Sequence, residues 1–353
     1  TAFWTANDCV TIWTTTQGIF TVRAGTAEII GLPESRVKVI PMEVGGGFGG
    51  KGPFYLEPVA AVLSRKTGHP VKMVMTRKEV FEGTGPGSAS HMRVKMGANR
   101  SGRITAAQFY LAYEAGAFPG SSVGGGATTG LGSYRIDNLL VDGYDVVVNK
   151  QKAAAYRAPG QQQASFAIET VVDELAEKLG MDPLEFRLKN VVQEGDRMPS
   201  GVPYPRIGCK EIEEAMKAHP HYSAPLEGPN RGRGIAVAFR HQGGQGASAT
   251  INVNSNGTIS LITGSMDLSG TRTTVAMQAA EVLGLSIDDV VSTVADTDSV
   301  GFSAGSHGSR ITFDTGLAAI AAAEEIKRQM SARAALLWEV QPEDVEFRDG
   351  IFI

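Results

Sequence analysis

The stretch from Gly45 to Lys51, with the sequence Gly-Gly-Gly-Phe-Gly-Gly-Lys, constrains this chain more than any other segment. It follows an apolar alternating run that predicts a strand at residues 36–40, and it precedes a helix predicted for residues 56–67. Glycine accepts a positive φ angle and has no Cβ to hold a ligand away. A strand, a glycine-rich loop and a helix in this order therefore predict a binding loop whose N–H groups face an anionic ligand.

The loop fits two phosphate-binding patterns only in part. The spacing Gly45-x-x-x-x-Gly50-Lys51 is that of a P-loop, but Gly52 stands where Ser or Thr should hold Mg²⁺. The loop also contains G-x-G-x-x-G, the dinucleotide-binding fingerprint, which needs an acidic residue about 20 positions further on. The strand predicted for residues 71–75 leads to Thr-Arg instead. Both patterns therefore fail their context.

A glycine-rich turn that only packs tightly is the remaining generic alternative. Phe48 argues against it, because a plain turn gains nothing by presenting a large apolar ring at its centre.

The composition is that of an ordinary globular protein. Of 353 residues, 42% are hydrophobic and 20% are charged, and this length allows two domains with separate cores. The net charge is −4 without a basic block, so nucleic-acid binding is not indicated. Two cysteines, Cys9 and Cys209, are too few for iron–sulfur ligation by this chain alone. The longest apolar run, residues 317–323, is far shorter than a membrane span.

Neither end of the sequence resembles a natural terminus. The chain starts at Thr1 without an initiator methionine and ends at Ile353 inside a predicted hairpin. No signal peptide is visible, so we expect a cytoplasmic protein, and a periplasmic location stays open because both ends look cut.

The pattern of the chain predicts an α+β fold with two mixed α/β domains. A polar, proline-rich break at residues 220–233 places the domain boundary, so that the first domain spans 1–222 and the second spans 231–353. The glycine-rich stretch 121–132 is predicted to be a loop or a close-approach segment. Further strands are predicted at residues 10–15, 71–75, 92–96, 104–113, 234–239, 249–254, 258–262 and 290–294.

The segments that start at Ala27 and at Ala280 share a helix–Gly–strand pattern, and each leads to a glycine-rich loop and another helix. The pattern starts a third time at Ala335. We infer related units that set two glycine loops in equivalent places, which suits two halves closing on one elongated ligand.

Tyr156-Arg157 lies in a Pro/Gly loop before the most regular helix of the chain, whose apolar positions run from Ala164 to Leu179 in steps of four and three. An arginine at a helix N-terminus can bind an anion or a ligand oxygen with two N–H groups, and a capping or surface role is the alternative.

Taken together, these segments resemble the molybdenum hydroxylases, the xanthine dehydrogenase and aldehyde oxidase group. The resemblance implies the central part of their molybdopterin-binding large subunit. In that family Gln17 would hydrogen-bond the molybdenum oxo group, and the backbone of Phe48 would face the metal. Arg157 would hold the pterin and the metal site, and Gly308-Ser309 would contact the ligand sphere of the metal. The residues expected around the cofactor are Gln17, Gly46, Gly47, Phe48, Gly49, Arg157, Ser269, Gly270, Gly308 and Ser309. Gln17, Phe48, Arg157 and Gly308 would lie around the molybdenum without being direct ligands.

Three departures from the family pattern concern the substrate. Gly52 replaces a glutamate that orients purines, Leu140 replaces a purine-orienting arginine, and Pro159 replaces a stacking phenylalanine. We therefore do not expect a purine substrate. Ala158-Pro159-Gly160 also lacks the cysteine of the carbon monoxide dehydrogenases, so carbon monoxide is not expected either. Ser269 replaces a glutamine that contacts the cofactor, which puts that contact in doubt.

The resemblance also implies what this chain lacks. The catalytic glutamate of the family has no counterpart before Ile353, so we expect it beyond this chain, in missing parts of the same subunit. The implied cofactor is molybdopterin with molybdenum, with a cytosine dinucleotide form left open. Iron–sulfur [2Fe–2S] and FAD groups are expected on partner subunits or domains. The implied reaction is hydroxylation of a small heteroaromatic or aldehyde substrate with oxygen from water. The alternatives are a non-catalytic scaffold of the same family and a P-loop NTPase.

Overall fold

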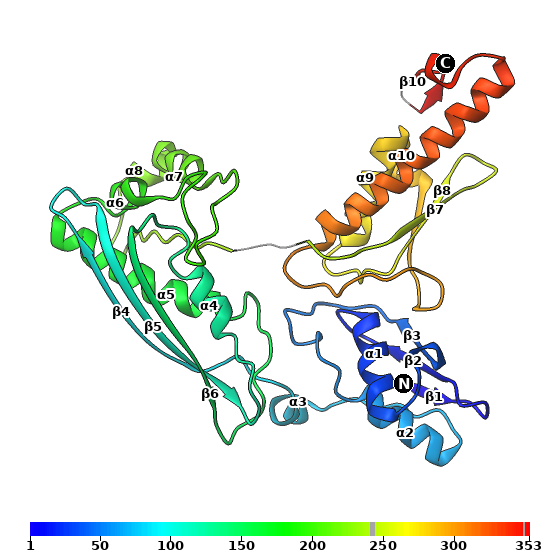
Figure 1. Ribbon diagram of the computed structural model, residues 1–353, viewed down its shortest axis with the longest axis horizontal. Coiled ribbons are helices and arrows are strands. Elements are labelled where there is room, and N and C mark those ends of the chain that lie inside the picture. Colours follow the sequence, from blue (N-terminus) through cyan, green and yellow to red (C-terminus); the bar gives the residue numbers. More distant parts are fainter. Residues whose placement is uncertain (241–243, 349) are drawn as a thin grey trace. The chain divides into compact units, whose positions relative to one another are not determined.

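The computed structural model describes residues 1–240, 244–348 and 350–353 of the chain (Figure 1). It divides into two compact units, the first formed by Thr1–Val80 with Gln242–Ile353 and the second by Phe81–His241. The helix α3 (Arg77–Gly83) spans the junction between them. The two mixed α/β units confirm the predicted fold class, and the boundary predicted between residues 222 and 231 stays a prediction.

The first unit begins with a three-stranded sheet and two helices. β1 (Ala2–Trp4) pairs antiparallel with β2 (Val10–Thr14), which pairs parallel with β3 (Val37–Pro41). Between β2 and β3 the chain forms α1 (Ile19–Ile30) and the short 3₁₀ helix η1 (Glu34–Arg36). α2 (Glu57–Thr67) follows the glycine loop. Alternate residues of β2 and β3 are buried, and they form one core with the inner faces of α1 and α2.

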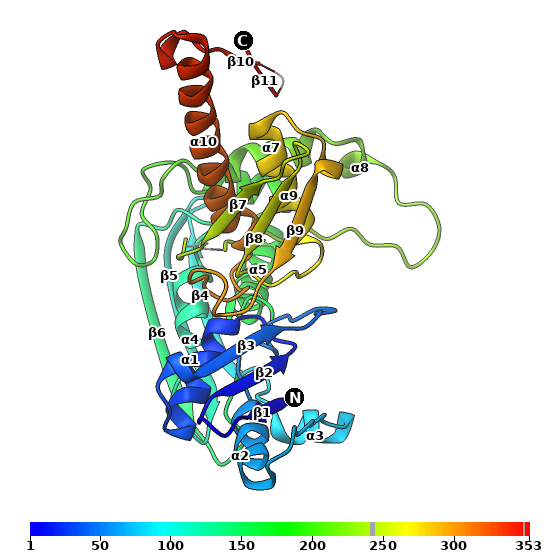
Figure 2. The same ribbon diagram turned by 90° about the vertical axis from the view of Figure 1, so that its right-hand side faces the viewer.

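The same unit contains a second copy of this arrangement. β7 (Ala249–Val253) pairs antiparallel with β8 (Ile259–Thr263), which pairs parallel with β9 (Val290–Val294). α9 (Thr271–Leu283) and the 3₁₀ helix η2 (Ile287–Asp289) connect β8 to β9, and α10 (Ile311–Trp338) comes after the second loop. α9 and α10 cover one face of this sheet (Figure 2).

The repeated pattern expected from the sequence is present at three helix ends. Gly31 and Gly284 end α1 and α9 in the left-handed conformation, with φ angles of 71° and 60°. Glu339 takes this position after α10, with φ of 57°. It is followed by η3 (Pro342–Asp344) and the small hairpin of β10 (Phe347–Arg348) and β11 (Ile351–Phe352). The third repeat therefore reproduces the helix end without the glycine that favours it.

The two repeats of the first unit are joined along one strand edge. The backbone N–H of Val39 in β3 donates to the hydroxyl of Thr297 over 3.0 Å, and the N–H of Thr297 donates back to the carbonyl of Val39 over 3.1 Å. Lys38 pairs with Asp296 at 3.2 Å beside this contact. The segment after β9 thus extends the edge of the first sheet, which fixes the two glycine-containing loops within one compact unit.

The second unit is a three-stranded sheet covered by helices on one face. β4 (Ser90–Ala98) pairs antiparallel with β5 (Ile104–Gly116), which pairs parallel with β6 (Asn138–Val147). α4 (Val123–Thr129) and the long α5 (Gln161–Leu179) lie on one face of this sheet (Figure 1). The buried side chains of Ala107, Phe109, Leu111 and Tyr113 in β5 form one core with these helices. α6 (Pro183–Asn190), α7 (Cys209–Ala218) and the one-turn α8 (Pro220–Ser223) complete the unit. The Asp182 carboxylate caps α6 at Leu184 and Glu185, as its sequence predicts.

Four sequence predictions of local structure differ from the structure. Residues 71–75 form only a single bridge, between Val71 and Ala2, instead of a strand. The stretch 121–132 contains the helix α4 and not a loop, whereas the predicted close approach is present, since a Cβ on Gly125 would lie 2.5 Å from the carbonyl oxygen of Pro159. Residues 234–239 are extended but join no strand of the described chain, and β6 was not predicted at all. Each error concerns a segment whose state depends on distant neighbours.

Within the described residues, no helix is both long enough and apolar enough to cross a membrane.

Candidate functional site

Gln17 is the centre of the predicted site in the first unit. It lies between β2 and α1, and only 5% of its surface is exposed. Its side-chain oxygen accepts hydrogen bonds from the N–H groups of Gly49 (2.9 Å) and Lys51 (3.2 Å). Its amide nitrogen donates to the carbonyl of Ser306 over 2.6 Å. Gln17 therefore connects the first glycine loop to the loop before α10, and these bonds fix the orientation of its amide.

The backbone of Gln17 makes the same connection. Its N–H donates to the carbonyl of Lys51 over 2.8 Å, and its carbonyl accepts from the N–H of Ser306 over 2.6 Å. The hydroxyl of Ser306 in turn donates to the carbonyl of Met266, which lies in the loop before α9. Gln17 therefore bonds two loops of the first unit, residues 45–52 and 303–310, and Ser306 links the second of them to loop 264–270.

Gly47 is required by the close approach of this loop to Gln17. A Cβ placed on Gly47 would lie 2.5 Å from both the side-chain carbonyl carbon and oxygen of Gln17, well inside van der Waals contact. A Cβ on Gly45, two residues earlier, would meet no atom within 4 Å. The packing around the loop therefore requires a glycine at position 47, whereas it leaves room for a side chain at position 45.

The N–H groups of residues 49–52 do not form the anion cradle that the sequence predicted. Those of Gly49 and Lys51 are taken by Gln17, and those of Gly50 and Gly52 donate to the carbonyls of Gly47 and Gly49. The next helix begins only at Glu57, so its N-terminus does not adjoin the loop. The prediction of a donor-rich phosphate pocket is therefore wrong for residues 49–52, and the physical basis of a P-loop is absent.

The loops share an unusual backbone conformation at the predicted cofactor positions. Phe48, Ser269 and Ser309 are non-glycine residues with φ angles of 54°, 60° and 57°, and each has a left-handed glycine beside it. Such angles cost about 1–2 kcal/mol for residues with a side chain, and they persist where the surrounding structure imposes them. Phe48 is 61% exposed, and its ring lies over Gly46.

Arg310 holds the loop before α10 from inside the protein. Its side chain is 1% exposed, and all five of its N–H donors have partners. One bonds the Asp314 carboxylate at 2.6 Å, and four bond main-chain carbonyls. Those carbonyls belong to Ala304, Gly305, Gln245 and Gly246. Arg310 directly follows Gly308 and Ser309, two residues predicted to lie at the cofactor, and its role in setting the shape of this loop was not predicted from the sequence.

Arg157 lies in the second unit, in an exposed loop that leads into α5. Ala158 next to it has a φ angle of 57° and Gly160 one of 78°. The hydroxyl of Tyr113 in β5 donates to the carbonyl of Gly160 over 2.9 Å, which fixes the end of the loop on the sheet. Burial raises the pKa of Tyr113 to about 12, so it stays a hydrogen-bond donor at physiological pH. The arginine loop is therefore held in a strained conformation by a buried phenol.

The predicted substrate residues are placed on different elements. Gly52 lies after the first glycine loop in the first unit. Leu140 is in β6, opposite Gln108 of β5, and is half exposed on the sheet. Pro159 is partly buried in the arginine loop. Within the first unit the structure brings together Gln17, Gly47 and Gly49, and it places Gly308 two residues after Ser306. Their roles toward a cofactor stay predictions.

The second unit contains a buried ionic cluster between α5 and α6 that was not predicted from the sequence. Glu169 of α5 carries a carboxylate but is only 6% exposed. Its carboxylate accepts two hydrogen bonds from the fully buried Arg187, one from the hydroxyl of Tyr134 and one from the N–H of Val237. Helical periodicity alone could not reveal this, because the arginine comes from α6.

Glu213 of α7 lies beside this cluster and is 1% exposed. One of its carboxylate oxygens contacts the thiol of Cys209 at 3.8 Å, and the other has no partner among the described residues. Burial raises the pKa of Glu213 to about 7, with the negative Glu169 adding to the shift and Arg187 opposing it. Burial also raises the pKa of Cys209 to about 11, so its thiol stays protonated.

The described residues hold no group of three or more His, Cys, Asp or Glu side chains that could bind a metal ion.

Comparison with known proteins gives the context of these loops. The pattern of the molybdopterin cofactor-binding domain matches residues 1–191, and a second pattern of the same description matches residues 211–353. The putative xanthine dehydrogenase molybdenum-binding subunit of Escherichia coli is 31% identical over 95% of this chain and 47% of its own length. The aldehyde oxidoreductase molybdenum-binding subunit of the same species is 31% identical over 99% of this chain and 48% of its own length.

Among solved structures, quinoline 2-oxidoreductase from Pseudomonas putida 86 is similar to 99% of this chain, with a TM-score of 0.84 and 26% identity, over 49% of its own length. This chain thus spans about half the length of the relatives that it matches.

Proposed function

The chain belongs to the molybdopterin cofactor-binding family of the molybdenum hydroxylases, and from this premise we propose that it contributes the cofactor-binding core of an oxidoreductase large subunit. The proposed reaction is hydroxylation of a heteroaromatic or aldehyde substrate. When bound, molybdopterin with molybdenum would supply the redox chemistry and take the oxygen from water. The role of the protein is then to bind, orient and shield that group.

The observation that carries this proposal is that Gln17 bonds two loops directly, residues 45–52 and 303–310, and that Ser306 links the second of them to loop 264–270. Gln17 gives one amide N–H to Ser306, and the amide group has a second N–H that can donate to a ligand oxygen. Because the oxygen of the same amide is held by Gly49 and Lys51, that second donor has a fixed direction. A single preset donor between glycine loops fits a bulky group that brings its own metal ligands.

The left-handed residues are proposed to present backbone groups to the same cofactor. Phe48, Ser269 and Ser309 carry conformational strain that the local packing must offset. Such strain is typical of positions that face a ligand. Arg272, in the first turn of α9, forms ion pairs with Asp267 at 3.3 Å and with Glu43 at 3.7 Å. Whether the pterin carries a cytosine nucleotide is a finer question, which release of the nucleotide by acid and chromatography would answer.

Substrate preference is proposed from the three departures in the sequence. Gly52, Leu140 and Pro159 offer neither charge nor an aromatic ring, so a charged purine would have no partner among them. The relatives named above include both a xanthine dehydrogenase and an aldehyde oxidoreductase subunit, so their names do not favour one substrate. The proposed preference against purines therefore rests on these three residues alone. Electrons would leave through iron–sulfur and FAD groups on partner subunits or domains, and the base glutamate would come from the rest of the large subunit.

A pair of glycine variants tests cofactor binding. Gly47→Ala in the complete large subunit should push Gln17 out of place and lower the bound pterin several-fold. Gly45→Ala should leave it unchanged, because a Cβ there meets nothing. Pterin can be measured by the fluorescence of its oxidised form. Equal pterin content in a folded Gly47→Ala variant and in Gly45→Ala would remove this loop from the cofactor site.

A further inference from the structure

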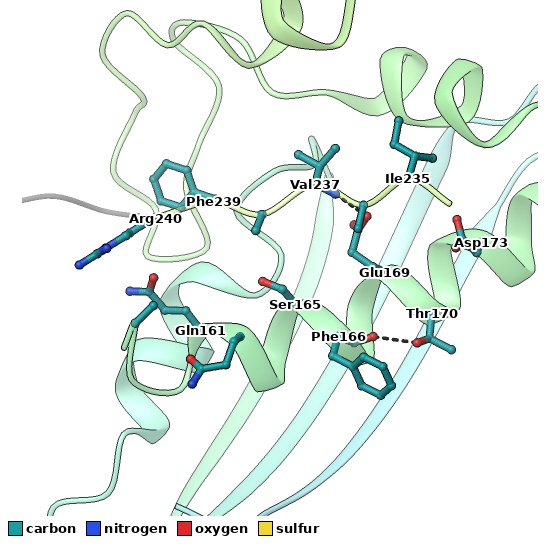
Figure 3. A pocket seen from close by; sticks show the side chains of 14 residues that line it. Gln161, Ser165, Phe166, Glu169, Thr170, Asp173, Ile235, Val237, Phe239 and Arg240 are labelled. Atoms are coloured by element: carbon teal, nitrogen blue, oxygen red, sulfur yellow. Dashed lines mark hydrogen bonds between the residues drawn. The ribbon is translucent and has the colours of Figure 1, made fainter. Parts of the chain in front are cut away.

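Residues 234–240 cross α5 as an extended segment, here called the strap (Figure 3). The N–H of Val237 donates to the buried carboxylate of Glu169 over 2.7 Å. The ring of Phe239 packs edge-on against Tyr204, with 5.4 Å between ring centres, and fills the space beside Gly132. These contacts fix the strap on the second unit, so its conformation is set by packing.

Exposed and half-buried side chains alternate along the strap as in a β-strand, but the strap pairs with no strand of the described chain. Ile235, Val237 and Phe239 are half-buried, whereas Ala236 and Ala238 between them are exposed. In an extended chain, the N–H and C=O groups of neighbouring residues point to opposite sides. Since the N–H of Val237 points to α5, those of Ala236 and Ala238 point away from it. No hydrogen bond from the described part of the second unit reaches either alanine.

The packing beside the strap is also incomplete. A pocket of about 600 Å³ lies between the strap and α5, and its wall includes the 76% exposed ring of Phe166 (Figure 3). An apolar strand edge with open backbone groups favours pairing with another strand, and natural proteins cover such edges. The strap therefore presents a template for strand addition, in which backbone hydrogen bonds supply the affinity.

We propose that the outer edge of the strap, at Ala236 and Ala238, pairs with a β-strand from the part of the large subunit that these 353 residues do not span. The matched relatives are about twice as long as this chain, so such a subunit has ample further sequence. A strand in the same polypeptide reaches the edge at a high effective concentration, which a second copy of the protein does not. This inference is independent of the cofactor and goes beyond the proposed activity.

Site-resolved hydrogen exchange on the complete large subunit in its native complex tests the pairing. The amides of Ala236 and Ala238 should exchange at least ~100-fold more slowly than open-chain amides. Ala238→Pro removes one of the outward N–H groups and should raise the exchange rate at Ala236. Ala238→Val keeps the N–H and favours a strand, so it should preserve protection. Open-chain rates at both alanines in the wild-type subunit would overturn the proposal, even if the proline variant does not fold.

A photo-reactive benzoylphenylalanine at position 238 identifies the strand that pairs with the strap. We expect cross-linking within the same polypeptide, to a peptide outside the 353 residues described here. A cross-link to a peptide inside these residues, or a cross-linked dimer whose yield falls on dilution, would contradict the proposed partner.

Discussion

The side-chain amide of Gln17 donates to the carbonyl of Ser306 across 2.6 Å, although 289 positions separate the two residues. The carbonyl of Gln17 also accepts from the N–H of Ser306. This pair joins the two repeats of the first unit at their glycine-containing loops. The two loops cannot move apart without breaking these buried hydrogen bonds. This connection supports the expectation that two related halves hold one ligand.

Replacing Gln17 by leucine should destabilise the protein by about 2–4 kcal/mol, since partly buried donors at Gly49 and Lys51 and a buried acceptor at Ser306 would lose their partner. Urea unfolding followed by tryptophan fluorescence measures this. Gln329→Leu, on the exposed face of α10, should change the free energy of unfolding by less than about 0.5 kcal/mol. Equal effects of the two substitutions would mean that Gln17 does not join the loops.

Arg310→Lys should cost about 3–5 kcal/mol of stability, because lysine cannot replace five N–H donors arranged around four carbonyls and one carboxylate. The exposed Arg328→Lys is the matched control on the same helix. Limited proteolysis should show earlier cleavage within residues 303–310 in the Arg310 variant. Wild-type stability of Arg310→Lys would refute the assignment.

Stability should fall as pH rises through about 7, because Glu213 is protonated in the folded state at pH values where it is ionised in the unfolded chain. Its folded pKa of about 7 lies above the ordinary 4.5, so its contribution is complete below pH 4.5 and is lost above pH 7. The difference is worth about 3 kcal/mol. Glu213→Gln should remove this loss, whereas Glu214→Gln on the exposed side of α7 should retain it. Melting temperatures between pH 5 and pH 8.5 provide the measurement.

Glu339→Gly should stabilise the end of α10 by up to about 1 kcal/mol, since Glu339 has a φ angle of 57° at a position where the other two repeats have glycine. The reverse change, Gly284→Ala after α9, should destabilise by a similar amount. Thermal unfolding of both variants tests the comparison. A loss of stability in Glu339→Gly would show that the glutamate side chain makes a contribution larger than the strain.

Local signals in the sequence were sufficient for much of the fold. The glycines after α1 and α9, the Asp182 cap and the alternation in β2, β5 and β8 each depend on nearby residues, and these elements were predicted. Residues 71–75 and 234–239 were predicted as strands, and the helix inside 121–132 was not predicted. The state of each of these segments depends on tertiary neighbours. The glycine loop shows the same limit, because the N–H groups of Gly49 and Lys51 bond Gln17, which lies 32 positions before Gly49.

Motifs that resemble a family led to the proposal of Gln17, Phe48 and Arg157 as site residues, and their roles toward a cofactor stay predictions. The roles of Ser306, Arg310 and Tyr113 follow from contacts between segments far apart in the chain, which composition and spacing do not reveal.

Molybdenum content, measured by elemental mass spectrometry on the native complex that contains this chain, tests the central claim most directly. The proposed function predicts about one molybdenum per copy, and a loss of most of it in an Arg157→Ala variant of the complete subunit. Unchanged molybdenum in that variant would remove Arg157 from the site. No molybdenum in the wild-type complex, from cells shown to load other molybdenum enzymes, would contradict the cofactor assignment and favour a non-catalytic scaffold of the same family.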